Sequence, residues 1–170
     1  MTAFWNSPST VEPKRAYRFF IQNGEGTWWW VKTASKPSVD INESVYKVGN
    51  SNIKYPGVAT WNDVAITIVD EKARAQKLYL SLQKAGYSPV NSQYVDGFSK
   101  TSANAELKAG GNFLIQQINS EGNIIEEWVL YNPWVKSISF SDLDYTSDEL
   151  STIDLTIAYD FAIITNPEVT

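Results

Sequence analysis

The 170-residue sequence contains no cysteine and no histidine. Without cysteine the chain has neither a disulfide framework nor thiol chemistry, and assembly in a reducing compartment is natural. Without histidine the commonest general base and metal ligand are missing, which excludes Ser-His-Asp and Cys-His catalysis, zinc deaminase motifs and HExxH sites. An enzyme would need carboxylate pairs, lysine, tyrosine or a carboxylate-bound hard metal, and no motif for these is present. We therefore expect no enzyme, no cofactor and no metal; the adjacent pairs Asp70/Glu71 and Glu126/Glu127 are more typical of a solvated surface or a cap.

Basic residues are missing from the C-terminal part. Residues 137–170 contain seven acidic residues and no lysine or arginine, whereas the rest of the chain holds 14 basic and 12 acidic residues, for a net charge of −5. This asymmetry argues against ordinary nucleic-acid binding through phosphates. No apolar run approaches the ~20 residues of a membrane span, and residues 1–13 are polar and interrupted by prolines, so we expect no signal peptide and no membrane partner.

What the sequence has in abundance is aromatic residues, at 14% with seven tryptophans, within an ordinary apolar fraction of 43%. Together with the β-branched residues they favour strands. A chain of this length fits one domain, residues 1–170, which buries roughly 70% of the surface of the unfolded chain.

Residues 63–86 organise the rest. The alternation over 63–69 predicts a strand, and the following residues predict one amphipathic helix over 70–85. Asp70 is a good N-cap with Glu71 in the first turn, Lys84 lies in the last turn, and Gly86 can adopt the left-handed conformation that ends a helix. Its apolar stripe needs a sheet to cover it, so we expect one helix that plugs a β-structure. The stripe consists of Ala75, Leu78, Tyr79 and Leu82.

Two hairpins are expected before this helix. The first has strands over 15–22 and 27–33 around a turn at 23–26. Its three consecutive tryptophans alternate faces, so both faces must be covered. Either they are buried in the fold or a subunit contact, or they form a platform for stacking on a ligand.

The second hairpin, residues 38–60, is longer and carries too few large apolar residues on any face for a core. Such arms are ordered by adding strands to a partner, which points to an assembly; the alternative is a mobile surface hairpin. Its expected contact residues are Val45, Tyr46, Val48, Ile53 and Tyr55.

Two further segments have weak patterns. Residues 1–14 are expected to form an arm, with Phe4 and Trp5 either anchoring it on a neighbour or fraying with the terminus. Residues 87–109 are rich in Ser, Asn and Gly and predict a long loop that is functional or ordered by a partner.

The remaining chain predicts a hairpin over 113–118 and 124–130, a Pro-Trp bend at 132–134, and strands over 137–145 and 152–163. In the last strand one face is apolar from Ile153 to Phe161, while the other carries Asp154, Thr156, Ala158 and Asp160. Two neighbouring strands that bury one face and expose Ser, Thr, Ala and Asp suit a channel lining and a barrel exterior equally.

Five segments occur in a characteristic order, namely the strand pair 19–31, the turn 32–37, the strand 61–68 before an acid-opened helix, the bend 130–135 and the terminal strand 153–161. In this order the chain resembles the tail tube proteins of contractile-tailed bacteriophages over residues 15–162. At the level of fold it also resembles the tubes of type VI secretion and extracellular contractile injection systems.

The resemblance implies a mainly β fold, a β-barrel or sandwich of two packed antiparallel sheets with one helix and a long protruding hairpin. It implies a structural protein of the virion tail that is assembled in the host bacterial cytoplasm. Its hexameric rings stack into a tube, with residues 38–60 as the inter-ring hairpin. The tube delivers the genome without binding it specifically. The implied partners are further copies of the chain, the tail sheath, the tape measure and baseplate or hub proteins.

An acidic lining repels phosphate, so we hypothesise that some acids of the C-terminal part face the lumen; the alternative is that they solubilise the outside. These acids are Asp142, Asp144, Asp148, Asp154 and Asp160. Other functions remain open: a tube initiator or minor ring near the baseplate, the inner tube of an injection or secretion system, or a carbohydrate-binding module that uses Trp28, Trp29 or Trp30.

Overall fold

The structure, a computed structural model, describes residues 13–88 and 97–166. Most of its regular structure is strand, which confirms the expected mainly β class. The predicted arm of residues 1–14, with Phe4 and Trp5, lies almost wholly outside the described residues. Residues 89–96 of the segment 87–109 also lie outside them. The strands are β1 (Phe19–Asn23), β2 (Gly26–Thr27), β3 (Val31–Ala34), β4 (Ser38–Val48), β5 (Ser51–Asn62), β6 (Val64–Val69), β7 (Phe113–Ile118), β8 (Ile124–Tyr131), β9 (Trp134–Phe140), β10 (Thr152–Ala158) and β11 (Phe161–Thr165). The helices are α1 (Arg74–Lys84) and α2 (Lys100–Lys108).

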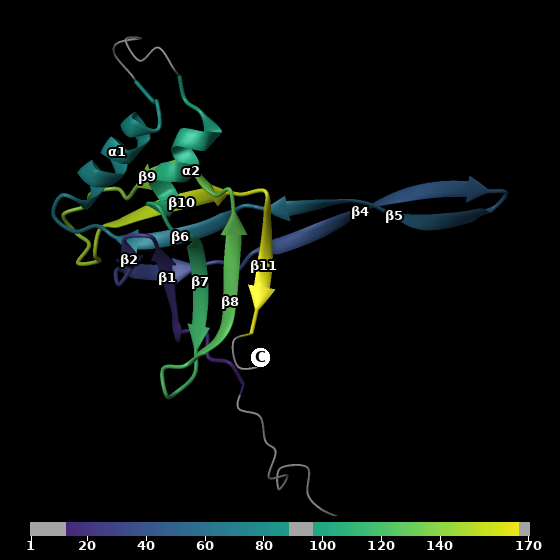
Figure 1. The fold of residues 1–170 in the computed structure, drawn as a ribbon, viewed down its shortest axis with the longest axis horizontal. Helices are drawn as coiled ribbons and strands as arrows, with labels where there is room; N and C mark the ends of the chain where they lie inside the picture. Colours follow the sequence, from purple (N-terminus) through teal and green to yellow (C-terminus); the bar gives the residue numbers. More distant parts are fainter. Residues whose placement is uncertain (1–12, 89–96, 167–170) are drawn as a thin grey trace, which may run out of the picture.

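The strands form two antiparallel sheets and a separate hairpin. Sheet A has the order β11-β8-β7-β1-β2, sheet B has the order β3-β6-β10-β9, and β4 and β5 pair only with each other. The strands of the two sheets cross at a steep angle, and the hairpin extends far beyond both (Figure 1). The expected sandwich with a protruding hairpin is therefore confirmed. We call the two sheets and two helices the body.

The core lies between the sheets. Sheet B contributes the almost completely buried side chains of Ile66, Ile68 and Leu155. Sheet A contributes the buried side chains of Ile21 and Phe113, which face them. Residues two apart on a strand share a face, so the alternation read from the sequence selects this buried side.

The expected final strand 152–163 is wrong as a single element, because the chain changes sheet in its middle. β10 pairs with β6 and β9 in sheet B, whereas β11 pairs with β8 in sheet A. Asp160 makes the corner, where its backbone N–H donates to the Tyr131 carbonyl at 3.0 Å. Phe161 consequently leaves the core face and stacks on Tyr131, with ring centroids 4.5 Å apart. Strands that switch sheets at corners are typical of steeply crossed sandwiches.

The three tryptophans do not lie on one regular strand. The chain turns at residues 29–30, between β2 and β3, which puts Trp28 and Trp30 on the same side with centroids 6.0 Å apart. Both pack against the core, whereas Trp29 is 84% exposed. Trp28 and Trp30 thus follow the expectation of burial in the fold, whereas Trp29 is not covered within its own chain. A subunit contact or a ligand platform at Trp29 stays a prediction.

Helix α1 starts later than predicted. Its N-cap position is Ala73, in the left-handed conformation and without a side-chain cap, so Asp70 is not the N-cap and Glu71 is not in the first turn. Glu71 instead pairs with Arg74 at 2.6 Å. The C-terminal prediction fits: Lys84 is in the last turn, and Gly86 has φ 109° and passes so close to Gly97 that a Cβ would overlap its carbonyl.

The same helix covers the body and does not plug it. No residue of α1 is fully buried; Ala75 and Leu78 pack against the core while Tyr79 is exposed. A cavity of about 410 Å³ lies beneath the helix, and the Arg74 guanidinium sits 3.4 Å from the centre of the Trp30 ring at its wall. This cation–π contact fixes the first turn of the helix on the sheet.

A second helix, α2, lies where the sequence predicted a loop. Ser99 is its N-cap, accepting a hydrogen bond from the Ser102 backbone N–H at 3.1 Å, and the left-handed Ala109 ends it. Only Ala103 and Leu107 of this helix are buried. The apolar residues Ala103, Ala105 and Leu107 are two positions apart and do not follow the helical period, although the serine cap was a usable signal.

Other boundaries differ less. The first strand begins at Phe19 and not at residue 15, and the strand expected over 137–145 is β9, which starts at Trp134 and ends at Phe140. Residues 141–151 form a loop, named the acidic loop below.

Candidate assembly surfaces

The hairpin of β4 and β5 extends away from the body (Figure 1). It exposes apolar side chains along its whole length. In its register Tyr46 is opposite Ile53, and directly opposite residues of an antiparallel pair lie on the same face. Four of the five predicted contact residues therefore share one face: Tyr46, Val48, Ile53 and Tyr55. Val45 lies on the other face, opposite Lys54.

A bulge divides the hairpin into an inner and an outer part. The register shifts between Ile41 and Glu43, and at this point Gly57 approaches the Asn42 carbonyl so closely that a Cβ would lie 2.8 Å from its oxygen. Bulges increase local twist, so the outer part is turned relative to the base. We call residues 44–55 the hairpin tip; it carries Lys47 and Lys54 and no acidic residue.

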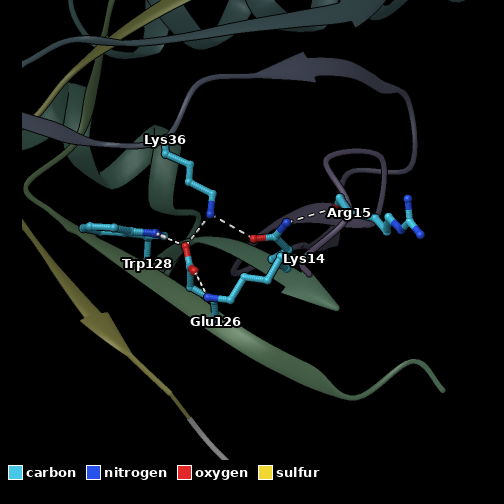
Figure 2. Close-up of polar contacts among 6 residues, drawn as sticks. Lys14, Arg15, Lys36, Glu126 and Trp128 are labelled. Carbon is cyan, nitrogen blue, oxygen red and sulfur yellow. Dashed lines mark hydrogen bonds and ion pairs between the residues drawn. The ribbon is translucent and has the colours of Figure 1, made fainter. Parts of the chain in front are cut away.

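The base of the hairpin is fixed to sheet A through Glu126 (Figure 2). Lys36, two residues before β4, donates to Glu126 Oε1 at 2.6 Å and to Gln117 Oε1 at 2.8 Å. Trp128 Nε1 donates to the same Glu126 oxygen at 2.7 Å, and Lys14 pairs with Oε2. The next residue, Pro37, is buried. We call this group the Glu126 clamp; it orients the first residues of the hairpin relative to the body.

The clamp determines the ionisation of Glu126, which is only 6% exposed. Burial by itself raises the pKa of the carboxyl, but hydrogen bonds from Lys14, Lys36 and Trp128 outweigh it and lower the pKa to about 2. The expectation of a solvated surface or cap is therefore wrong for Glu126. No local pattern predicts this, because the two lysine partners lie 90 and 112 positions away in the sequence.

The exposed face of sheet B is small and polar. Thr33, Thr67, Asp154 and Ser139 are neighbours across β3, β6, β10 and β9, and a second row contains Ala65, Thr156 and Ser137. Asp154 is the only charged residue in the two rows, and it accepts a hydrogen bond from Thr67 Oγ1 at 2.6 Å. The two rows therefore offer no cation to hold a phosphate, and Lys136, which precedes Ser137 in β9, pairs with Asp63 at 2.6 Å.

The structure separates the five acids that the sequence grouped. Asp154 lies on the exposed face of sheet B, and Asp142, Asp144 and Asp148 lie in the acidic loop. Asp160 is at the corner before β11, where it pairs with Lys100 and accepts from Asn132 Nδ2 at 2.8 Å. These contacts, Lys100 first, lower the pKa of Asp160, so its charge has a structural use in joining α2 to the corner.

Residues 13–88 and 97–166 contain no group of three or more histidine, cysteine, aspartate or glutamate side chains that could hold a metal ion. No helix within those residues is both long and apolar enough to cross a membrane.

Comparisons with family models and with curated proteins give no match. Comparison with solved structures gives matches over nearly the whole chain. The anti-feeding prophage cap, an AFP tube terminating cap, has a TM-score of 0.70 at 17% identity, with 98% of this chain and 99% of that chain covered. A chain of the sheath-tube complex of PVC, an extracellular contractile injection system, has a TM-score of 0.65 at 18% identity, with 92% and 94% covered.

The chain has the fold of the tube proteins of contractile injection systems. A type six secretion system protein is a more distant match, with a TM-score of 0.50, 10% identity, and 88% and 83% covered. The resemblance drawn from the sequence is thus confirmed at the level of fold. The hairpin of this chain comprises β4 and β5, residues 38–62. Its apolar side chains are exposed, and the Glu126 clamp lies at its base.

Proposed function

We propose that this tube-fold protein is the subunit of the tail tube of a contractile phage-like particle, in which hexameric rings stack into a tube. The observation that carries the proposal is the hairpin, which exposes Tyr46, Val48 and Ile53 on a fold shared with tube and tube-cap proteins. A large exposed apolar surface is a contact surface in a soluble protein. The role is structural and needs no chemistry by the individual subunit.

The hairpin tip makes the contact with the next ring. Tyr46, Val48, Ile53 and Tyr55 supply its apolar face, and Val45 lies on the reverse. Deleting residues 48–53 removes the end of the hairpin without touching the body, so the variant should fold and remain unassembled. Far-UV circular dichroism measures folding and negative-stain electron microscopy measures assembly. Tubes of normal length from the deleted protein would refute this role.

The exposed face of sheet B lines the lumen, with Asp154 as its acid. Short hydroxyl side chains give a passing polyanion little to bind, and an acid repels it. The acids of the loop and the paired Asp160 are less suited to this role than Asp154, because the loop lies beyond the sheet and Lys100 neutralises Asp160.

The absence of cysteine makes this lining testable with a single introduced thiol. Ser139→Cys places a thiol beside Asp154, and the matched Ser120→Cys places one in the exposed turn between β7 and β8. A polymer-linked maleimide should label both variants as monomers and only the Ser120→Cys variant in tubes. Equal labelling of the two in tubes would place the sheet B face outside.

The proposal includes delivery of the genome through the tube. It also includes a location in the virion tail, assembly in the bacterial cytoplasm, and contacts with sheath, tape measure and baseplate or hub proteins. Contacts with sheath and baseplate proteins are supported by chains of a sheath-tube complex and of a baseplate that share the fold. Genome delivery, the virion and cytoplasmic assembly rest on the resemblance drawn from the sequence.

A second candidate is a ring that ends the tube. It is favoured by the match to the AFP tube terminating cap, which covers nearly all of both chains. Purified protein separates the two: a tube subunit forms stacked rings at high concentration, whereas a cap forms single rings that bind the ends of tubes made by another chain.

A further inference from the structure

The acidic loop exposes apolar side chains as fully as the hairpin does. Leu143 is 92% exposed, Leu150 is 72% exposed, and Tyr145 is fully exposed. The same loop carries four acidic residues and no basic residue. The acids are Asp142, Asp144, Asp148 and Glu149. Apolar side chains of this size that pack on nothing in their own chain indicate a contact with another surface.

The loop holds a defined shape on its own. Ser141 Oγ and Ser151 Oγ lie 2.9 Å apart at its neck, and the Asp70 backbone N–H donates to the Ser151 carbonyl at 2.9 Å. Within the loop Asp144 accepts from the backbone N–H and from Oγ1 of Thr146, both at 2.9 Å. A surface that is already ordered loses less entropy when it binds.

The hairpin tip and the acidic loop lie at opposite ends of the body. β6 continues from β5 of the hairpin, and its last residue, Val69, is opposite Thr152, the residue that follows the loop. The loop therefore lies at the end of sheet B away from the hairpin (Figure 1). Two different surfaces at opposite ends of one chain allow a head-to-tail contact that repeats from copy to copy.

The two surfaces are complementary in charge. Lys47 of the tip takes part in none of the ion pairs among residues 13–88 and 97–166, and Lys54 pairs only with the exposed Glu43. In the register Lys47 and Lys54 lie on the reverse face of the hairpin, with Val45. Their long side chains can reach past the edges of this two-stranded ribbon, so both can meet acids that flank the contact while the apolar face meets Leu143 and Tyr145. Opposite charges on facing surfaces select the partner and the orientation.

We propose that the hairpin tip of one copy docks on the acidic loop of the next copy along the tube. This inference rests on the proposed self-assembly and names its second surface. Asp142 and Asp148 then serve ring stacking, whereas Asp154 alone serves the lumen.

A charge exchange tests the pairing. The tip variant Lys47→Glu/Lys54→Glu and the loop variant Asp142→Lys/Asp148→Lys should each raise the protein concentration needed for tube formation by about tenfold or more, measured by sedimentation and electron microscopy. Asp144 is left unchanged because it holds the loop. Combining the two variants recreates opposite charges on facing surfaces and should restore tubes.

The control separates local pairing from net charge. Lys72→Glu/Lys77→Glu, on the exposed surface at and near the start of α1, combined with the loop variant has the same net charge as the rescued protein and should not form tubes. All altered side chains are exposed, and an unchanged unfolding temperature verifies each fold. Normal assembly of either charge-reversed variant, or no rescue on combination, overturns the docking proposal. A wild-type protein that never assembles overturns the proposed function itself.

Discussion

The hairpin and the body are built from the same kind of strand and are used in opposite ways. Ile41 in β4 and Ile66 in β6 both lie in strands of apolar–polar alternation, yet Ile41 is 64% exposed and Ile66 is 1% exposed. The body covers its apolar face with a second sheet, whereas the hairpin has no second layer. Stability is therefore concentrated in the body, and the hairpin is free to contribute binding surface.

The largest effect on stability is expected in the centre of the body. Phe113 is completely buried and meets Trp28 edge-to-face at 5.6 Å between ring centres. Phe113→Ala leaves a cavity and should lower the free energy of unfolding by about 3–5 kcal/mol. Urea denaturation, at concentrations below those of assembly, measures it. A loss below about 1 kcal/mol would show that the sheets do not pack as described.

The clamp between the two regions should come second. Glu126→Gln removes the charge that Lys14 and Lys36 face, and the loss is expected to reach about 2–3 kcal/mol at neutral pH. The pKa of Glu126 is depressed in the folded state, so its contribution is present above the unfolded value of 4.5 and is lost as pH falls toward about 2. Wild type should therefore lose stability over that interval more steeply than the variant. Parallel pH profiles would contradict the clamp.

A smaller loss is expected at the edge of the body. Ser99→Ala removes the N-cap of α2 and should cost about 1 kcal/mol, while Ser99→Thr keeps the hydroxyl and most of the stability. Hydrogen exchange of the α2 amides provides the local readout. Identical exchange in both variants would mean that the cap is not used.

The smallest effect on stability is expected in the hairpin. Tyr46→Ala/Ile53→Ala truncates two exposed side chains that face each other, so the free energy of unfolding of the monomer should change by less than about 0.5 kcal/mol. Tube formation should fall sharply. The comparison fails if this variant unfolds as easily as Phe113→Ala, because the hairpin would then be part of the folding unit.

Local patterns were enough to predict much of this architecture. Much of the prediction depended on neighbours in the sequence: the alternation in 64–69 and 153–157, the hairpins over 38–60 and 113–130, and the C-terminal end of α1 at Lys84 and Gly86. The long hairpin was predicted because its strands lack the large residues of a core. Each of these signals acts within a few residues.

The errors of prediction have a common origin in tertiary contacts. Asp70 has the sequence position of a cap, but its backbone N–H donates to the carbonyl of Ser151 at the end of the acidic loop. The helix begins later, after Ala73. The last strand alternates without interruption, but the corner at Asp160 is held by Lys100 and Asn132 and sends β11 to the other sheet. Glu126 looks like a surface acid in the sequence, but the fold places Lys36, 90 positions away in the chain, beside it.

The sequence by itself determined which segments become strands and which face of each is apolar, because side-chain periodicity and turn chemistry are local. Only the tertiary structure decided which apolar faces are covered, where the chain changes sheet and which acids are neutralised, because those outcomes depend on residues that are distant in sequence and adjacent in space. The separation of Asp154 from Asp142 and Asp148, and the opposite placement of hairpin tip and acidic loop, belong to this second kind.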